Sequence, residues 1–233
     1  MTRLYATTLV ATMLSIACSH GEPIGPLQHE HTVVNLDRAE LSRIRLTMEA
    51  GELRVKGGAA KLAEADFTYN VAAWKPSVVQ NLNRTPPELS ITQATGVSTS
   101  GNTTNRWELA LNDQQPLEII AHLGAGEAHM TLGGLNLRNV ELTVGAGEVD
   151  MDLRGQPTTS YSVSIHGGVG TATVHLPSTV AISAKASGGL GDINVSGLEQ
   201  RDGRWINPRA TSSPVTIDLD VHGGIGEIRL EAE

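Results

Sequence analysis

The sequence predicts an all-β fold, namely a single-domain β-solenoid in which each rung has two strands joined at a glycine bend. Three observations predict it. Six stretches of alternating apolar residues run into a glycine and a polar residue, after which the alternation resumes out of phase. In the second half these glycines recur after 21, 23 and 21 residues, before a last step of 35. The chain also has 25 glycines but only one Phe, three Tyr and three Trp, which favours short strands and tight corners. The predicted bend glycines are Gly51, Gly126, Gly147, Gly170, Gly191 and Gly226.

The bend prediction depends on the spacing of apolar residues around each glycine. Ala146 precedes Gly147 and Val149 follows two positions after it, so the two apolar residues are three positions apart. Because side chains on a strand alternate faces, an odd step turns the second set to solvent unless the backbone bends or bulges there. Glycine permits such a bend because it accepts positive φ. We therefore expect Ala146 and Val149, and their equivalents, to share one interior.

The N-terminus, residues 1–18, is predicted to be a signal peptide. A singly basic start precedes an apolar stretch, residues 4–17, which is too short to span a bilayer comfortably. It ends at Cys18, the only cysteine, after small or aliphatic residues that resemble the bacterial lipobox, in which the cysteine is acylated. The match departs from the usual pattern because Leu14 stands four places before the cysteine. The alternative is an ordinary secretory signal with an incidental cysteine. Both predict export, and a single cysteine excludes an intrachain disulfide.

Residues 19–32 separate this leader from the predicted domain, residues 33–233. They hold glycine, proline and polar residues without a period, so we expect a flexible tether. The domain begins with a predicted strand pair around Gly51. A strand is predicted over residues 65–74, with Phe67 and its alternating apolar neighbours on one face.

Two segments interrupt the regular pattern. Residues 77–106 contain several turn signals and are predicted to be an irregular loop. Residues 199–213 are predicted to be an insertion that explains the step of 35 residues. This insertion carries Trp205, which we expect to cap an end of the stack, as exposed terminal strands need protection.

Composition and motifs argue against several functions. The net charge of −8 leaves no basic face for nucleic acid or for direct adhesion to anionic lipid. The sequence lacks the motifs of serine hydrolases, zinc proteases and phosphate-binding loops. We therefore expect no catalytic residue, no cofactor and no resident metal. The alternative enzyme class is a β-helix carbohydrate-active enzyme, which needs paired carboxylates in a groove.

The polar residues that follow the bend glycines form a candidate cation column. If the rungs stack in register, these side chains are about 4.8 Å apart. Neighbouring carboxylates at this spacing must point apart into water, share a proton or hold a cation such as calcium. The glycine-aspartate repeats of calcium-binding solenoids are absent, which favours exposed carboxylates without an ion. The candidate residues are Glu127, Glu148, Asp192 and Glu227.

Two histidines, His166 and His222, lie four residues before a bend glycine. Zinc sites need three or four converging ligands. We therefore expect these histidines to face solvent or to form caps.

Residues 117–153, which include two GAGE motifs, resemble the toastrack domains of bacterial envelope proteins. Residues 67–76 and the later HGGVG, SGGLG and HGGIG motifs extend the resemblance to about residues 36–230. The resemblance implies a parallel β-solenoid outside the cytoplasmic membrane, often attached to transmembrane segments in proteins of envelope stress response. This sequence departs from that pattern in having only the leader and Cys18, which favours a surface-attached lipoprotein over a signalling role.

The sequence thus predicts a non-catalytic, exported scaffold or binding module of the cell envelope. We expect it to be lipid-anchored through Cys18, on the outer side of the cytoplasmic membrane or in the outer membrane. Its expected partner is an unidentified protein or cell-wall component. The alternative is an adhesin-like module that forms homo-oligomers through open sheet edges.

Overall fold

The structure is a computed structural model that describes residues 22–36, 39–99 and 101–233. The described residues form strands and one 3-10 helix, which confirms the all-β prediction. The leader and Cys18 lie outside the described residues. The elements are β1 (Ile24–Val34), β2 (Ser42–Gly57), β3 (Ala63–Val71), η1 (Ala72–Trp74), β4 (Ser77–Asn81), β5 (Glu88–Thr92), β6 (Asn105–Leu111), β7 (Leu117–Thr131), β8 (Leu137–Asp152), β9 (Tyr161–Leu176), β10 (Ala181–Leu190), β11 (Ile193–Ser196), β12 (Glu199–Arg201), β13 (Arg204–Ile206) and β14 (Thr216–Ala232).

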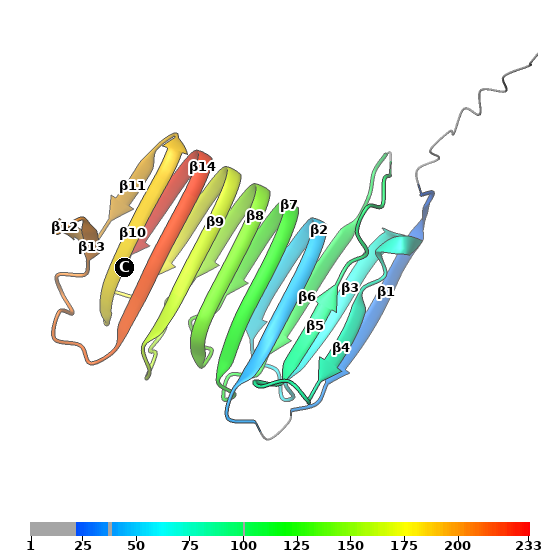
Figure 1. Cartoon of the computed structure of the whole chain (residues 1–233), viewed down its shortest axis with the longest axis horizontal. Helices are drawn as coiled ribbons and strands as arrows, with labels where there is room; N and C mark the ends of the chain where they lie inside the picture. Colours follow the sequence, from blue (N-terminus) through cyan, green and yellow to red (C-terminus); the bar gives the residue numbers. More distant parts are fainter. Residues whose placement is uncertain (1–21, 37–38, 100) are drawn as a thin grey trace, which may run out of the picture.

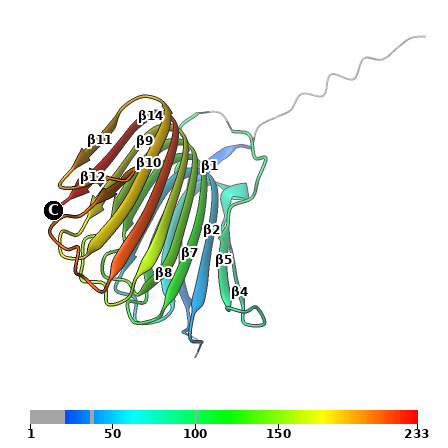
Figure 2. The ribbon, with the colours of Figure 1, turned by 60° about the vertical axis from the view of Figure 1, so that its left-hand side comes forward.

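The long strands fold at mid-length into arches that stack side by side like slices in a rack (Figures 1 and 2). Each rung therefore has a first arm before the bend and a second arm after it. The rungs pair in parallel and in register, so that the bend glycines of β2, β7, β8, β9 and β14 stand opposite one another. All six predicted bend glycines have positive φ, between 133° and 144°. A strand is thus turned around the interior at each rung.

The interior is apolar, but the residue before each bend glycine does not line it as we expected. Ala146 is exposed, whereas Val144 and Val149 are buried on the two arms of the same rung. The inward step across the bend is therefore five residues. Five is also odd, so the bend still changes the phase of the alternation. The residue before the glycine points outward because it lies at the convex apex of the arch.

The last two rungs do not stack in chain order. β14, the final strand of the chain, pairs with β9 on one side and with β10 and β11 on the other. The rung made of β10 and β11 is thus the end of the stack, although β14 follows it in sequence (Figure 1). The step of 35 residues between Gly191 and Gly226 includes the long connection that lets β14 return and pair between β9 and β10.

The predicted tether, residues 19–32, is wrong for residues 24–32, which belong to β1. This strand pairs antiparallel with β3, and the Glu30 carboxylate accepts hydrogen bonds from the Tyr69 hydroxyl and the Lys75 ammonium. Most of its side chains are exposed because it is an edge strand. An edge strand can therefore form without the apolar alternation that predicts one.

The irregular loop predicted over residues 77–106 is also partly wrong. β4 and β5 pair antiparallel within it, and β5 lies beside the first arm of β2 and pairs with it in parallel. The predicted insertion, residues 199–213, contains the β12–β13 hairpin, and β13 places Trp205 opposite Ala184 of β10. In the described ranges, no helical segment has the length and apolar character that a membrane crossing requires.

Candidate functional site

The outer apex of the arches carries a continuous row of apolar side chains, which we call the bend ridge. It consists of the residues that directly precede the bend glycines. In the order of the stacked rungs they are Ala50, Ala125, Ala146, Val169, Ile225 and Leu190. The side chains become larger toward the last rung, where Val169 and Ile225 are each 53% exposed and Leu190 is 69% exposed. The ridge therefore presents apolar surface mainly at one end of the rack.

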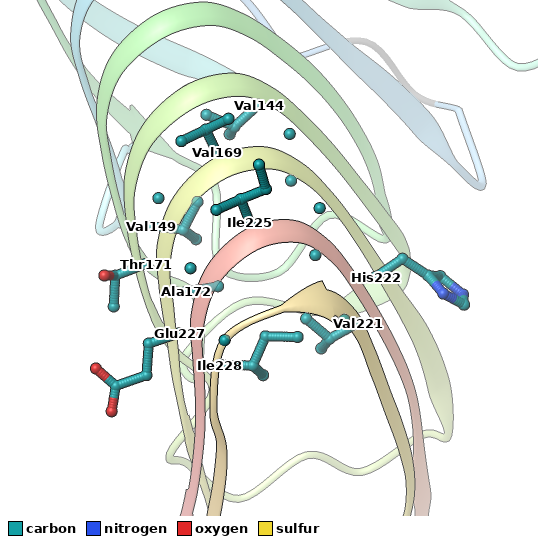
Figure 3. A pocket seen from close by; sticks show the side chains of 18 of the residues that line it. Val144, Val149, Val169, Thr171, Ala172, Val221, His222, Ile225, Glu227 and Ile228 are labelled. Carbon is teal, nitrogen blue, oxygen red and sulfur yellow. The ribbon is translucent and has the colours of Figure 1, made fainter.

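Beneath the ridge, the inward side chains become smaller toward the last rung. The inward position three residues before the bend glycine is filled by buried side chains in the first three rungs and by glycine in the last three. These residues are Met48, Leu123, Val144, Gly167, Gly223 and Gly188. The missing side chains leave a cavity of about 30 Å³ under the last bends, lined by Val221 and Ile228 among others (Figure 3). In the close view, Val221 and Ile228 point into the arch whereas Ile225 lies on its outer side.

The close stacking of the bends requires glycine in the GxG motif for steric reasons. A Cβ atom on Gly147 would lie 1.8 Å from the carbonyl oxygen of Gly126 in the preceding rung. A Cβ atom on Gly145 would lie 2.4 Å from the carbonyl oxygen of Gly124. Hydrogen atoms occupy these places, which suits weak Cα–H···O contacts between rungs. At both positions the carbonyl of one rung faces the next rung of the stack.

The first bend is sealed by two amide side chains. Gln93, which is 1% exposed, accepts hydrogen bonds through Oε1 from the backbone N–H groups of Glu49 and Ala50, at 3.0 and 3.4 Å. Asn105 donates through Nδ2 to the Ala50 carbonyl at 2.6 Å and to Gln93 Oε1 at 2.9 Å. The backbone groups that a preceding rung would have satisfied are thus satisfied by side chains.

The last bend has no comparable cover among the described residues. β13 pairs with β10 only at Ser183 and Ala184, which leaves the outer edge of the segment from Lys185 onward without a strand partner. A Cβ atom on Gly191 would lie 1.7 Å from the Gly226 carbonyl oxygen, and Gly126, Gly147, Gly170 and Gly226 show the same contact with the preceding bend glycine at 1.7–1.9 Å. By the same repeat, the carbonyl of Gly191 faces away from β14, toward the open end. The rack is therefore closed at one end of the bend ridge and open at the other.

The candidate cation column is only partly continuous. In register order it reads Glu52, Glu127, Glu148, Thr171, Glu227 and Asp192, so a threonine separates its two acidic parts. A carboxylate oxygen of Glu52, a carboxylate oxygen of Glu127 and a ring nitrogen of His129 lie within 4.8 Å of one another. However, Glu52 already accepts hydrogen bonds from Arg54 and Arg106, the latter at 2.6 Å. These arginines occupy the oxygens that a cation would need.

Arginines also lower the pKa of two carboxylates in this row, Glu52 and Glu227. Burial acts to raise the pKa of Glu52, but the hydrogen bonds from Arg106 and Arg54 outweigh it and hold the pKa below its usual value. The guanidinium of Arg229 and the amide of Asn194 likewise lower the pKa of Glu227. The carboxylates of Glu52 and Glu227 are thus stabilised in the charged form by arginine.

The two equivalent histidines form a stacked pair that the sequence pattern did not reveal. The rings of His166 and His222 have centroids 5.2 Å apart and planes 9° apart. His222 Nδ1 is 2.6 Å from the Ser187 hydroxyl, and His166 Nε2 is 3.1 Å from the Ser164 hydroxyl. A serine nucleophile needs a base that is itself oriented by a third group, usually a carboxylate. Among the described residues no carboxylate hydrogen-bonds to either imidazole, so this arrangement lacks the third member of a triad.

The geometry of the chain is that of a known family. The model of the N-terminal domain of toast_rack, DUF2154, matches residues 23–175, and the chain belongs to this family. A crystal structure of a putative cell adhesion protein from Clostridium sporogenes is similar at 30% identity and a TM-score of 0.85. That match covers 89% of this chain and all of the other.

A second solved structure, a putative adhesin from Bacteroides fragilis, matches at 9% identity with a TM-score of 0.37. It covers 88% of this chain and 97% of the other. No curated protein matches this sequence.

Proposed function

We propose that this protein is a non-catalytic binding module of the bacterial cell surface, which acts as an adhesion or scaffold domain. The observation that carries the proposal is the likeness, over the whole of the other chain, to the putative cell adhesion protein from Clostridium sporogenes. The regular rack supports it because its rungs pair in register and several ion pairs link neighbouring strands on its polar faces, such as Arg43–Glu118 and Arg106–Glu52. Such faces are stable surfaces for presenting a contact region.

We further propose that the chain is exported and held at a membrane by a lipid on Cys18. The resemblance of the residues before Cys18 to a lipobox supports this. β1 lies at one end of the rack and the open last rung lies at the other (Figure 1). A chain anchored just before β1 presents its open end away from the membrane. The contact region of an adhesion domain is expected at that distal end.

Binding is tested with the purified chain coupled to beads and offered to whole cells and to isolated cell-wall material. We expect saturable retention above that of beads coated with an unrelated all-β protein. Cell-wall material recovered from the beads should be chemically unchanged, as expected for a non-catalytic module. The absence of retention by either material would contradict the proposal, and release of soluble sugars would favour the carbohydrate-active enzyme.

Anchoring is tested with Cys18→Ser in the full chain. We expect the variant to move from the membrane fraction to the soluble exported fraction, because an acyl chain supplies most of the membrane affinity of such a protein. Thr12→Ser, a conservative change within the same leader, should leave the fractionation unchanged. Persistent membrane association of Cys18→Ser would remove the lipid anchor from the account.

A further inference from the structure

We propose that the open bend of the last rung, residues 185–192, binds an extended segment of another protein in which a bulky aliphatic side chain stands next to lysine or arginine. The inference rests on the proposed function, because it names the class of partner that the binding module takes. The segment would add to the stack as one further strand. This mode of recognition is β-strand addition.

The first support is the unequal treatment of the two ends of the bend ridge. At the first bend, the buried amides of Gln93 and Asn105 satisfy the backbone groups that no rung covers. At the last bend, the described chain provides no such cap, and the carbonyl of Gly191 faces outward. The Cβ position of Gly189 lies 2.6 Å from the Gly224 carbonyl oxygen, so by the same repeat the Gly189 carbonyl is directed to the open end. This edge therefore offers hydrogen-bond acceptors to a partner with N–H donors.

The second support is the apolar surface that surrounds these acceptors. Leu190 is 69% exposed, and Ile193, just beyond the bend, is 40% exposed. Leu190 stands opposite Ile225 of β14, which is itself 53% exposed. The cavity left by Gly167, Gly188 and Gly223 lies directly beneath these residues. An aliphatic side chain of an added strand would cover Leu190 and Ile193 and so remove apolar area from water.

The third support is charge. Lys185, the one cation of residues 185–192, stands opposite Asp220 of β14, whereas Asp192, next to the bend, has no such partner. The carboxylate of Asp192 is exposed, and no described residue forms an ion pair or a hydrogen bond with it. A lysine or arginine of the partner would complement this carboxylate and the carbonyls of Gly189 and Gly191.

The experiment measures binding of labelled nine-residue peptides to the purified chain by fluorescence anisotropy. The probes are a basic peptide, GKVKLKVKG, an acidic peptide of the same pattern, GEVELEVEG, and the basic peptide with N-methyl groups on alternate amides. We expect the basic peptide to bind at least about tenfold more tightly than either of the others, because they lack the charge or the N–H donors. Rising salt should weaken binding of the basic peptide.

Two variants locate the site. Leu190→Ser and Asp192→Asn should each weaken binding of the basic peptide about tenfold, through lost apolar contact and lost charge respectively. Leu27→Ser is the matched control, because Leu27 is 49% exposed on β1 at the opposite end of the rack. Thermal unfolding should be almost unchanged in all three variants, since the side chains are exposed, which separates loss of binding from loss of folding.

The inference is overturned if no peptide binds, if the basic and acidic peptides bind equally, or if Leu27→Ser weakens binding as much as Leu190→Ser. It is also overturned if sedimentation shows a dimer that Leu190→Ser dissociates, because the occupant would then be a second copy. Retention of cells or cell-wall material by beads carrying Leu190→Ser, equal to that of the unchanged chain, would leave the proposed function intact and refute only this site. Absence of retention by the unchanged chain would refute the proposed function while the peptide result stands on its own.

Discussion

Two glycines on neighbouring rungs should respond in opposite ways to the same substitution. Gly147→Ala places a methyl group 1.8 Å from the Gly126 carbonyl oxygen at φ of 140°. The backbone conformation alone costs about 1–3 kcal/mol for a non-glycine residue, and the rung must also move away from its neighbour and weaken ladder hydrogen bonds. We expect a total loss of about 3–5 kcal/mol in the free energy of unfolding.

Gly167→Ala is the matched control because the new methyl group enters the cavity beneath the bends. Its nearest neighbour would be the His222 carbonyl oxygen at 3.9 Å, and the equivalent position in β8 is the buried Val144. Reduced freedom of the unfolded chain gives about 0.4–1 kcal/mol, and burial of one methyl group gives about 0.8 kcal/mol. We expect a net gain of about 1–2 kcal/mol.

The assay is urea unfolding of the purified variants, followed by circular dichroism and tryptophan fluorescence. The midpoint should fall strongly for Gly147→Ala and rise for Gly167→Ala, with similar slopes. Equal midpoints for Gly147→Ala and the unchanged chain would refute the close stacking of the bends. A destabilised Gly167→Ala would refute the cavity beneath the last rungs.

Three further predictions concern the cap, the arginines and calcium. Gln93→Ala should lower the free energy of unfolding in urea by about 2–4 kcal/mol, because two backbone N–H groups lose their acceptor. Gln80→Ala, on the exposed β4, should lower it little. Equal effects of the two substitutions would contradict the cap. The stability that Glu52 contributes through its lowered pKa is present above its usual value of 4.5 and is lost as pH falls below 4.5. Arg106→Gln should therefore make the urea midpoint less dependent on pH in this acidic range. Arg201→Gln, which removes the partner of the exposed Glu199, should leave the pH dependence unchanged. The same pH dependence in the unchanged chain and both variants would refute the role of Arg106 in lowering the pKa of Glu52. Calcium at about 1 mM should leave the melting temperature unchanged, and a clear rise would show that the candidate cation column binds the ion.

The sequence predicted the bends because phase changes in an alternating strand have few physical solutions. It did not predict that Ala146 points outward, since spacings of three and five residues are both odd and both signal a bend. Nor did it predict the place of β14 in the stack. The rungs share one apolar pattern, so every parallel pairing in register satisfies it equally, and the pattern contains no information on order.

The ends of the rack were harder to predict than its middle. β1 has glycine, proline and histidine where an interior strand has aliphatic residues, because an edge strand needs only backbone pairing on one side. The seal at the first bend depends on Gln93 and Asn105, two amides in a stretch of turn-forming residues. Their role becomes visible only when β5 and β6 bring them against Ala50. The HGGVG motif shows that glycine, at Gly167, replaces the larger residue found at Val144. That this glycine leaves a cavity beneath the last bends follows only from the register of the strands.

The order of the last rungs determines which bend is open, and it is tested by disulfide trapping in a Cys18→Ser background. Thr173 of β9 stands opposite Arg229 of β14, and Asn194 of β11 stands on the far side of β14. Air oxidation should link the cysteines of Thr173→Cys/Arg229→Cys, because paired strands bring Cα atoms within disulfide range. A link in Thr173→Cys/Asn194→Cys instead would show that the rungs stack in chain order, that β14 is the outermost rung, and that the open bend is not the one described.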